Sequence, residues 1–556
     1  MNPLLQTHFD TALEHPNGIR KLRELILTLA MQGKLVPQDP NDPPASELLK
    51  EIQAGKARLV AEGKVKKSEA LPPVKEEEKP FAIPKGWEWV RLGECIELIS
   101  GQHLRSNEYN ENQNGIPYFT GPADFGDISP IGNRWTNIRR AIALKGDILL
   151  TVKGAGIGKT NIVIQDEAAI SRQLMALRVW KLNKQYLGYY LNVMFAKFQE
   201  LATGIAIPGI GRDDVLHRYF PLPPLAEQKR IVEKIDELLA LCDELERLKQ
   251  SKDAKRKDLH QSVITQMLEA ETHAVFQKQF HFLTTHFYEL YAVKENVKEL
   301  RKAVLQLAVM GKLVPHDPND QPASELLKEI QAEKARLVAE GKIKKSDALP
   351  SVKEEEKPFV IPKGWEWVRL GEVGVLERGK SKHRPRNDIK LFRNGKYPLV
   401  QTGDVSAAKK NKDSISSVSN YYNEFGLAQS RMWDPGTLCI TIAANIAETG
   451  FLSISACFPD SVVGFTSLSG YHTSKYVKMF IDTAKEHLEN FAPATAQKNI
   501  NLGILTELIC PLPPMAEQKR IVEKVDQLMA LCDDLEGGIG KAEEKRGEIL
   551  EGMVRG

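Results

Sequence analysis

The sequence predicts an α+β protein in which two tandem globular domains are each followed by a long helix, with a pseudo-twofold internal repeat. Three observations lead to this prediction. The segment Pro221–Glu246 returns almost letter for letter at Pro511–Glu536, 290 residues downstream. The segment Pro84–Gly93 returns at Pro362–Gly371, 278 residues downstream. Between these repeats, short β-rich runs alternate with glycine, proline and asparagine, and helical stretches follow.

The size and composition of the chain set the broad class. A chain of 556 residues is too long for one hydrophobic core, which predicts roughly three to five units. Its 42% hydrophobic and 27% charged residues are usual for a soluble protein, and a net charge of +3 neither predicts nor excludes a nucleic-acid partner. The first 35 residues lack a signal pattern and no apolar run has membrane length. We therefore expect a cytoplasmic protein with no membrane partner.

The cysteines give no sign of a metal site or a disulfide framework. The chain has six, with no C-x-x-C pair and no Cys/His cluster. Two of them, Cys242 and Cys532, occupy matching positions of the two long helices, where a small apolar side chain is expected. We expect no metal site.

The duplication defines the domain organisation. Because the offset between the copies grows from 278 to 290 residues, the second divergent segment is 12 residues longer than the first. The predicted parts are a conserved helical block at 1–80, a divergent domain at 81–222, a central helix at 223–268, a linker with the second helical block at 269–358, a second divergent domain at 359–512 and a C-terminal helix at 513–556.

Three segments around the helical blocks carry more local predictions. Ser46 is a candidate N-cap of a helix that Gly63 closes. The charged, proline-flanked run 72–80 predicts an exposed linker. Residues 269–295 show no repeat partner and are partly helical in pattern, so we expect them to connect the two halves.

Each long helix begins after a proline suited to the first turn, Pro224 in the first copy. Apolar residues then recur at 4-3-4-3 spacing, as in the a/d seam of a coiled coil. The seam positions are Ile231, Ile235, Leu238, Cys242 and Leu245 in the first helix and Ile521, Val525, Leu528, Cys532 and Leu535 in the second. We infer that the two seams bury each other.

One glycine-rich turn, Lys153–Thr160, resembles a nucleotide-binding P-loop without satisfying it. The pattern G-x-x-x-x-G-K-[ST] requires glycine at 153, where Lys153 stands. The corresponding segment 443–450 has no lysine. We therefore expect a turn between strands, in which backbone N–H groups and Lys153 or Lys159 could approach a phosphate.

No set of residues has the pattern of an active site. The chain has no Asn/Asp-Pro-Pro-aromatic tetrapeptide of the kind that amino-methyltransferases use, no H-E-x-x-H and no dinucleotide fingerprint. Its histidines are scattered, and His103, His217 and His383 are expected on the surface. The sequence predicts a protein that carries out no bond chemistry itself.

Basic residues gather in both divergent domains. From Arg378 to Lys396 there are eight Lys and Arg within 19 residues, against one acid, Asp388. Such a run is more often a solvated face than a binding site. Polar residues that can read base edges accompany it here, namely Gln102, Asn133, Gln173, Gln497 and Asn499. Arg and Lys can bind guanine edges and phosphates, and Asn and Gln adenine edges, which favours a nucleic-acid partner.

The candidate DNA-contacting residues of the first domain are Arg105, Arg134, Arg139, Arg140, Lys153, Lys159, Arg172 and Arg212. Those of the second domain are Arg378, Lys380, Lys382, Arg384, Arg386, Lys409, Lys410, Gln497 and Lys498.

The repeated motif Pro-Leu-Pro-Pro-Leu-Ala-Glu-Gln-Lys-Arg-Ile-Val, opening a long helix twice, resembles the specificity subunit of type I restriction–modification systems. The stretch Gly146-Asp-Ile-Leu-Leu-Thr, the Gly-Lys-Leu-Val-Pro blocks and the Pro-Ala-Ser-Glu-Leu-Leu blocks are also similar to elements of that family. The likeness covers nearly the whole chain. Two features depart from it: only some members have the long block before each domain, and Gly537-Gly-Ile-Gly540 is expected to shorten the second helix.

The resemblance implies that each divergent segment is a target recognition domain that reads one half of a bipartite, asymmetric double-stranded DNA sequence. The two long helices would pair antiparallel as a spacer. Two methyltransferase subunits would bind S-adenosylmethionine and methylate adenine. Restriction subunits would supply ATP-driven translocation and cleavage with Mg²⁺. This chain would bind none of these cofactors and would be non-catalytic.

Two other hypotheses remain open at this point. The chain could be a structural adaptor that binds no DNA and holds partner subunits at a set geometry. It could also be an enzyme that uses the near P-loop at Lys153–Thr160. A bipartite sequence preference with a steep salt dependence distinguishes the DNA-binding subunit from both.

Overall fold

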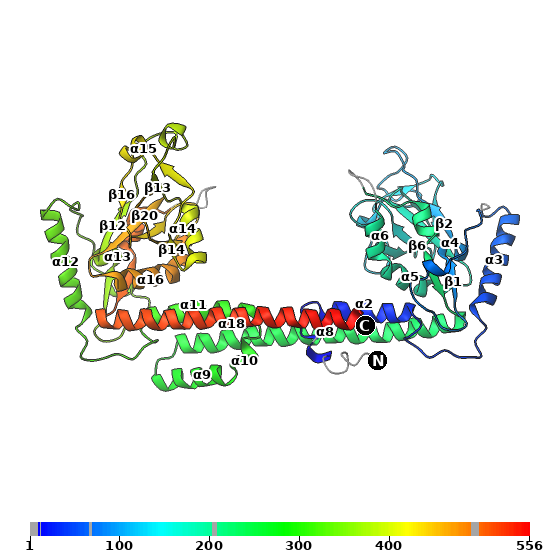
Figure 1. The fold of residues 1–556 in the computed structure, drawn as a ribbon, viewed down its shortest axis with the longest axis horizontal. Helices are drawn as coiled ribbons and strands as arrows, with labels where there is room; N and C mark the ends of the chain where they lie inside the picture. The colour runs from blue at the N-terminus through cyan, green and yellow to red at the C-terminus, as the bar shows by residue number, and fades with distance from the viewer. Residues whose placement is uncertain (1–8, 12, 66–68, 203–207, 491–499, 556) are drawn as a thin grey trace. The chain divides into compact units, whose positions relative to one another are not determined.

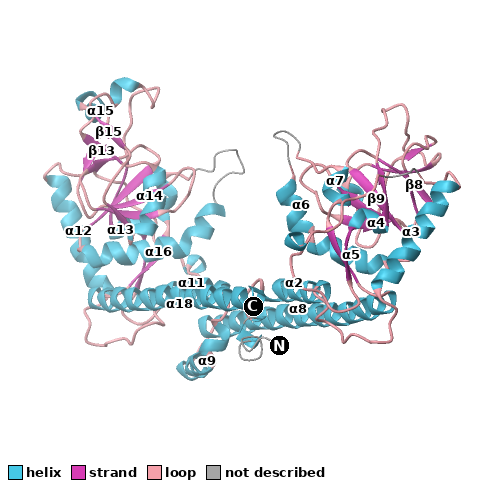
Figure 2. Cartoon of the chain, turned by 45° about the vertical axis from the view of Figure 1, so that its right-hand side comes forward, coloured by secondary structure: helices cyan, strands magenta, loops and turns pink. Residues whose placement is uncertain are grey.

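The computed structural model describes residues 9–11, 13–65, 69–202, 208–490 and 500–555. It divides into two compact units, the first comprising Met1–Ser251 with Glu543–Gly556 and the second Lys252–Ala542. Each unit holds one helical block, one divergent domain and the start of one long helix (Figures 1 and 2).

A pair of short strands closes each divergent domain. We call this pair, together with the helical block before the domain and the start of the long helix after it, the frame of the domain. In the first unit β1 (Glu88–Arg91) pairs antiparallel with β10 (Tyr219–Leu222), with Trp89 opposite Pro221. In the second unit β11 (Glu366–Arg369) pairs with β21 (Ile509–Leu512), with Trp367 opposite Pro511. The two ends of each domain therefore meet in the same register directly before the long helix.

The first domain consists of two four-stranded sheets with helices beside them. The first sheet has the order β2-β9-β6-β7 and the second β4-β3-β8-β5, with β3 and β8 parallel and the other pairs antiparallel. Their bounds are β2 Ile96–Ser100, β3 Ile116–Phe119, β4 Trp135–Thr136, β5 Ile142–Leu144, β6 Ile148–Thr151, β7 Thr160–Ile162, β8 Glu167–Ile170 and β9 Leu174–Val179. The short elements are α4 Leu92–Cys95, η2 Pro122–Asp124, α5 Lys184–Val193, α6 Phe195–Leu201 and α7 Arg212–Leu216.

The second domain has the same topology despite its different sequence. Its sheets have the orders β12-β20-β17-β18-β14 and β15-β13-β19-β16, and again one inner pair, β13 with β19, is parallel. The bounds are β12 Gly374–Arg378, β13 Tyr397–Leu399, β14 Ser414–Ile415, β15 Asn420–Tyr422, β16 Met432–Trp433, β17 Leu438–Thr441, β18 Thr449–Leu452, β19 Ala456–Cys457 and β20 Val462–Ser467. Helices α13 Leu370–Val373, α16 Tyr471–Asn490 and α17 Leu502–Glu507 correspond in order to α4, α5 and α7.

The greater length of the second domain lies in its peripheral connections. Between β13 and β15 the chain forms α14 (Thr402–Ala408), η5 (Lys409–Asn411) and β14, which adds a fifth strand parallel to β18. Two further short helices, η4 (Ile389–Leu391) and α15 (Glu424–Ala428), lie in neighbouring connections. The inner strands of the two domains thus match while their loops differ.

The helical blocks contain α2 (Gly18–Met31), α3 (Ala45–Ala61) and η1 (Glu76–Glu78), repeated as α11 (Lys294–Val309), α12 (Ala323–Ala339) and η3 (Glu354–Glu356). The predicted N-cap of α3 is wrong: Pro44 holds that position in an extended conformation, and Ser46 lies inside the first turn. Gly63 follows the helix with a positive φ of 69°, as a closing glycine requires.

The predicted linker at 72–80 is mostly exposed, but it is anchored to the frame. The buried Arg91 donates two hydrogen bonds to the carboxylate of Glu78, at 3.0 and 2.8 Å. The same guanidinium donates to the main-chain oxygens of Pro72 and His217. Hydrogen bonds from the Lys75 N–H and from Arg91 lower the pKa of Glu78. Arg369 and Glu356 repeat this contact in the second unit.

The two long helices are α8 (Leu225–Leu268) and α18 (Met515–Arg555). Their seams do not meet as predicted. Ile231, Ile235 and Cys242 are buried in the core of the first unit together with apolar residues of α2, and Ile521 and Val525 are buried in the core of the second unit with residues of α11. The 4-3-4-3 spacing shows that one helix face is buried, and here each unit supplies its own preceding helix as the partner.

The long helices nevertheless pack on each other, through the predicted seam residues Cys532 and Leu535 of α18 and through residues of α8 outside its predicted seam. In the second unit Val263, Ile264 and Met267 of α8 share a hydrophobic cluster with Cys532 of α18, against which Leu535 packs. α8 begins in the first unit and ends in the second, whereas α18 begins in the second and ends in the first, as an antiparallel pair requires. The predicted shortening of α18 at Gly537-Gly-Ile-Gly540 is wrong, because the helix continues through these residues.

The segment predicted to lack a repeat partner contains α9 (His273–Thr285) and α10 (Phe287–Leu290). Arg301 of α11 contacts Asp533 and Glu536 as Arg23 of α2 contacts Asp243 and Glu246, so α11 and α2 correspond. At the same offset, Thr285-His286-Phe287 matches the sequence Thr7-His8-Phe9. The prediction is therefore wrong from about residue 285 onward. No helix in the described ranges is long and apolar enough to cross a membrane.

Candidate nucleic-acid interface

Four strand ends converge at one end of the first domain's larger sheet, which we name its loop end. β2 and β6 finish there and β9 and β7 begin there, since Ser100 pairs with Met175, Thr151 with Leu174, and Leu150 with Thr160. The loops that follow or precede these residues must therefore lie side by side. They contain four of the candidate residues: Arg105, Lys153, Lys159 and Arg172.

These four side chains are exposed at the loop end. Lys153 and Lys159 flank the turn between β6 and β7, and Arg172 lies two residues before β9. In the described part of the chain none of the four side chains has an ion-pair partner. Their charge is therefore available to a ligand, and phosphate is the ligand that unpaired Lys and Arg attract most generally.

The other candidates of the first domain are held by neighbouring groups. Arg139 pairs with Glu167, and Arg140 pairs with Glu108 at 3.2 Å. The hydrogen bond from the Arg105 N–H and the nearby Arg140 lower the pKa of Glu108. Arg212 donates to the Leu98 carbonyl at 3.0 Å and to Ser100 Oγ at 2.9 Å. The guanidinium of Arg134 lies 5.4 Å from the ring centre of Tyr109.

The second domain has the equivalent loop end, where β12 and β17 finish and β20 and β18 begin. Arg378 pairs with Val463, Thr441 with Val462, and Ile440 with Thr449. The basic run predicted from the sequence starts at the last residue of β12 and continues directly into this loop end. Lys409 and Lys410 lie in η5, within the connection that the first domain lacks.

The basic run is partly neutralised and partly available. Arg384 and Arg386 pair with Asp460, and Arg378 donates to the main-chain oxygen of the same residue. The side chains of Lys380, Lys382, Lys409 and Lys410 are exposed, with no ion pair among the residues that the structure describes. Gln497 and Lys498 lie outside the described residues.

The turn between β17 and β18 differs in charge from its counterpart between β6 and β7. The main-chain oxygen of Lys159 accepts a hydrogen bond from the Thr151 N–H, and that of Glu448 accepts one from the Thr441 N–H, so Lys159 and Glu448 occupy equivalent places. Glu448 in turn pairs with Lys485 of α16. The first domain thus presents a basic turn where the second presents a neutralised one.

A matching glycine starts the loop after the first strand of each sheet. A Cβ on Gly101 would lie 2.0 Å from the Ser171 carbonyl oxygen, and one on Gly379 would lie 2.2 Å from the Pro459 carbonyl oxygen. No side chain fits at either distance. These glycines let the loop after β2 or β12 pass directly over the segment before β9 or β20, which brings the basic residues of both together.

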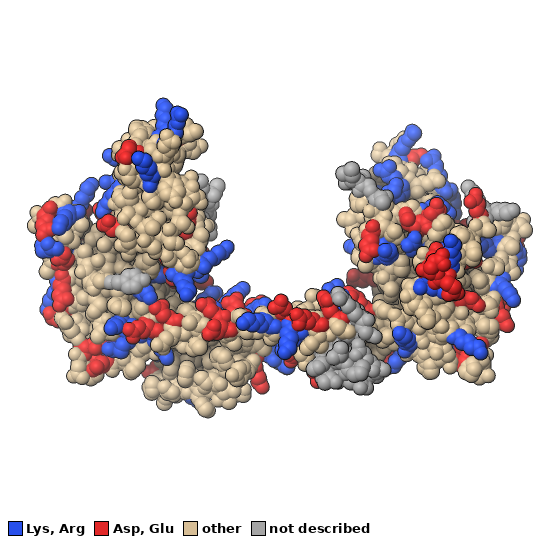
Figure 3. Space-filling model, in the orientation of Figure 1, with Lys and Arg blue, Asp and Glu red and all other residues tan. Residues whose placement is uncertain are grey.

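Figure 3 shows Lys and Arg side chains at the end of each domain remote from its own long helix, with Asp and Glu interspersed over the rest of the visible face. In Figure 1 β12 runs from α13, near the long helix, toward this remote end of the domain, and the loop end lies where β12 finishes. The loop end is therefore the basic end of the domain.

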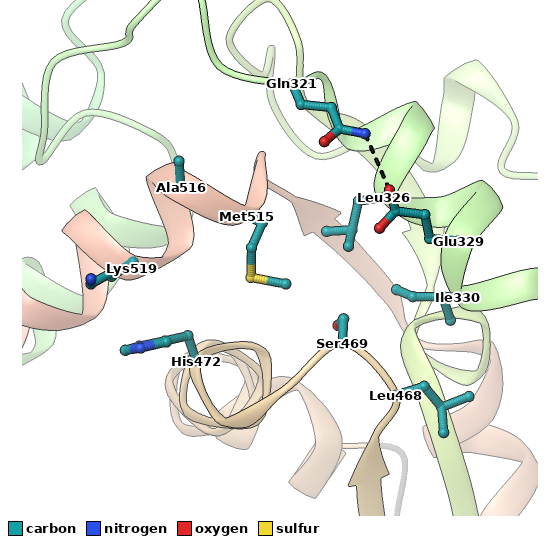
Figure 4. Close-up of a pocket in the computed structure, with 10 residues that line it drawn as sticks. All are labelled: Gln321, Leu326, Glu329, Ile330, Leu468, Ser469, His472, Met515, Ala516 and Lys519. Atoms are coloured by element: carbon teal, nitrogen blue, oxygen red, sulfur yellow. Dashed lines mark hydrogen bonds between the residues drawn. The ribbon is translucent and has the colours of Figure 1, made fainter. Parts of the chain in front are cut away.

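A cavity of about 470 Å³ in the second unit lies elsewhere. Leu468 and Ser469, which follow the C-terminal end of β20, line it with residues of α12 and with Met515 at the start of α18. In Figure 4 Leu326, Met515 and Ser469 point into this space. Because the loop end lies at the N-terminal end of β20, the cavity is at the opposite end of the sheet and belongs to the frame.

The frame depends on residues whose role sequence analysis missed. Gln228 donates to the Pro223 carbonyl and accepts from the N–H of Asn183, both at 2.9 Å. Gln518 donates to the Pro513 carbonyl at 2.9 Å and accepts from Thr473 Oγ1 at 2.8 Å. Both glutamines are fully buried. Their presence in both copies of the motif was the signal that could have identified them.

The near P-loop is a turn between strands, as predicted. Lys159 is followed at once by β7, whereas a P-loop leads into a helix whose N-terminus binds the phosphates. Among the described residues no group of three or more His, Cys, Asp or Glu could hold a metal ion. All six cysteines are buried free thiols, and burial raises the pKa of Cys95, Cys439 and Cys510.

The two domains and their frames match a known family model. The model described as the type I restriction modification DNA specificity domain matches residues 84–256 and again 362–543. These matches cover more than half of the chain and follow its two repeats. The chain therefore belongs to the family of type I restriction–modification specificity subunits, which recognise DNA target sequences and leave catalysis to partner subunits. The adaptor hypothesis and the enzyme hypothesis are accordingly not supported.

Named relatives extend over almost the whole chain. It is 32% identical to the Escherichia coli type I restriction enzyme EcoAI specificity subunit, over 97% of this chain and 93% of the relative. It is 30% identical to the EcoEI specificity subunit of the same organism with the same coverage. The crystal structure of the HsdS subunit from Thermoanaerobacter tengcongensis is similar with 17% identity and a TM-score of 0.43, over 86% of this chain and 99% of that one.

Proposed function

We propose that this specificity subunit reads a bipartite, asymmetric double-stranded DNA sequence, with one half-site for each divergent domain. One observation carries the proposal: the two domains share a single sheet topology, yet their loop ends present different residues. A common scaffold with different loops suits two readers of different sequence. The exposed Lys and Arg at each loop end supply the positive charge that DNA binding needs.

The long helices are proposed to set the spacing between the half-sites. α8 has 44 residues, which corresponds to a length of roughly 66 Å at the rise of an α-helix. One turn of DNA is about 34–36 Å long. A helix of this length is long enough to hold two readers apart by more than one turn of the duplex.

Two methyltransferase subunits are the proposed partners of the repeated frame, with restriction subunits joining them. Leu241 and Leu531 stand at matching positions of α8 and α18 and are 55% and 61% exposed. The repetition of this position, like that of the rest of the motif, suits two copies of one partner. On this proposal S-adenosylmethionine, ATP and Mg²⁺ bind to the partner subunits, and the complex works in the cytoplasm.

Selection of DNA by the full-length chain tests the proposal. Duplexes with two randomised blocks and a variable spacer are incubated with the chain and its methyltransferase partner, and the bound fraction is sequenced. We expect one bipartite sequence, bound with an affinity that falls steeply with salt. Exchange of residues 359–512 for the same segment of another family member should change one block only. Equal binding of all duplexes, or a change in both blocks, would contradict the proposal.

A further inference from the structure

Asp460 gathers three arginines of the basic run at the loop end of the second domain. It lies two residues before β20, and its main-chain oxygen accepts a hydrogen bond from Arg378 Nε. Its carboxylate accepts one from Arg386 Nη2, and Arg384 Nη2 lies 3.5 Å from the other carboxylate oxygen. A segment that the sequence shows only as a run of charge is thereby folded around one acid.

The charges at this cluster do not cancel. Arg384 and Arg386 share one carboxylate and Arg378 contacts only a main-chain oxygen, so the three arginines and Asp460 have two net positive charges. The side chains of Arg384 and Arg386 are 55% and 50% exposed, whereas that of Asp460 is 25% exposed. A guanidinium has five N–H donors. The contacts with Asp460 and, for Arg384, with the Ser381 and His383 carbonyls use only some of them, so each arginine keeps donors for a ligand.

The equivalent place in the first domain has the opposite charge. The N–H of Val152 bonds to the Gln173 oxygen and that of Ile442 to the Ser461 oxygen, which makes Arg172 the counterpart of Asp460. Arg172 is exposed, and its side chain has no ion pair among the described residues. A cationic residue there cannot hold two arginines together. The paired arrangement is therefore a property of the second domain.

We infer that Asp460 is a positioning residue that presents Arg384 and Arg386 as a pair of guanine-reading side chains for the half-site of the second domain. This inference rests on the proposed function. A guanidinium fixed by a carboxylate offers its remaining donors in one plane, which suits the two acceptors, O6 and N7, that guanine exposes in the major groove. The second half-site should then contain two G·C pairs that depend on these arginines.

The experiment compares variants of the full-length chain in the DNA selection described above. Arg384→Ala and Arg386→Ala should each relax the preference for guanine at one position of the second block, by about 5- to 150-fold. Asp460→Asn removes the charge that aligns the pair and should relax both positions together. Arg172→Ala is the matched control from the first domain, and it should leave the second block unchanged.

A salt series separates base reading from phosphate binding. If Arg384→Ala and Arg386→Ala weaken every duplex equally and reduce the slope of log K against log salt by about one each, the pair binds phosphate and the inference is wrong. If they relax the preference while Asp460→Asn does not, Asp460 has no positioning role. An unchanged first block in the Arg384, Arg386 and Asp460 variants shows that the first domain is folded and still binds its half-site. A wild-type chain without sequence preference would instead refute the proposed function.

Discussion

Trp365 Nε1 donates a hydrogen bond to Glu517 Oε2 at 3.0 Å, and this contact is buried. Trp87 and Glu227 make the same contact at the same distance in the first unit. The other carboxylate oxygen accepts from Gln38 Nε2 in the first unit and lies 2.7 Å from His316 Nδ1 in the second. A buried carboxylate needs several hydrogen bonds. Both units therefore have a second polar partner for the glutamate, which is Gln38 in the first unit and His316 in the second.

Replacement of the buried glutamate should destabilise its unit. Glu227→Ala leaves the Trp87 donor without its acceptor and removes one acceptor of Gln38, at a cost of roughly 1–3 kcal/mol in the free energy of unfolding. Urea denaturation of the full-length chain, followed by tryptophan fluorescence, measures the change. Glu233→Ala, at an exposed position two turns further along α8, is the control and should be neutral within about 0.5 kcal/mol. Equal effects of both substitutions would contradict the role of Glu227.

The anchored linker leads to a second expectation. Arg91→Ala removes the two bonds to Glu78 and two bonds to main-chain oxygens, so residues 72–80 should detach from the frame. Limited proteolysis should cleave the variant within this segment faster than the wild type. The control is Arg20→Ala, because among the described residues the ion pair of Arg20 is an exposed one with Glu24. Cleavage at the wild-type rate would show that other contacts hold the linker.

A buried lysine should make stability depend on pH. The ammonium of Lys334 donates to the carbonyls of Gly371 and Glu372, and burial lowers its pKa to about 8. The unfolded chain, with a pKa near 10.5, then binds more protons between pH 8 and 10.5, so this lysine contributes increasing stability as pH rises through that window.

Lys334→Met removes this contribution. The stability of the wild type minus that of the variant should therefore increase between pH 8 and 9.5, by up to roughly 1.4 kcal/mol per pH unit. Thermal unfolding at a series of pH values gives the difference, in which the other titrating groups cancel. Lys50→Met, at an exposed position of α3, should show a constant difference. A constant difference for Lys334→Met as well would contradict the lowered pKa.

Much of the fold was predictable because the repeated segments mark the ends of two matching domains and the starts of two long helices. The β-rich runs of the sequence include 147–152 and 437–442, and these form β6 and β17 at matching places of the two sheets. The partner of the helix seams was not predictable. A 4-3-4-3 spacing shows that one face of a helix is buried but does not identify what buries it, and α2 and α11 supply apolar faces of similar length.

The candidate interface was predictable only as a set of charges. The sequence does not distinguish Arg139, which pairs with Glu167, from Arg172, whose side chain has no ion pair among the described residues. These distinctions depend on contacts between residues far apart in the chain, such as Arg386 with Asp460. Such contacts are determined by the register of the strands, which the composition of a segment does not reveal.

Substitution of Lys159 distinguishes a role in DNA contact from a role in nucleotide binding. Lys159→Ala should reduce the slope of log K against log salt by about one and leave the second block of the recognised sequence unchanged. ATP hydrolysis by the complex with its partner subunits should be unaffected at saturating DNA, since β7 follows this lysine directly. Lys50→Ala is the control for a loss of charge remote from the loop end. Loss of ATP hydrolysis in the Lys159 variant at saturating DNA would contradict the prediction.

The length of the long helices should determine which spacer the subunit accepts. The boundaries between the units fall within α8, after Ser251, and within α18, after Ala542, so insertions there leave both domains intact. An insertion of one heptad in both helices adds about 10 Å and changes the helical phase by only about 20°. Three further base pairs would match that distance but would rotate the second half-site by roughly 100°. We therefore expect binding to the original target to fall steeply and no spacer to restore it fully.

A longer insertion can satisfy both distance and rotation. About 25 residues, or seven helical turns, add roughly 37 Å, close to the rise of 11 base pairs, and both the helix and the duplex then return nearly to their starting orientation. The doubly extended chain should select the same two blocks with a spacer about 11 base pairs longer. Selection with spacers of every length measures this directly. If both insertion variants keep the original spacer, the helices do not set the distance between the half-sites.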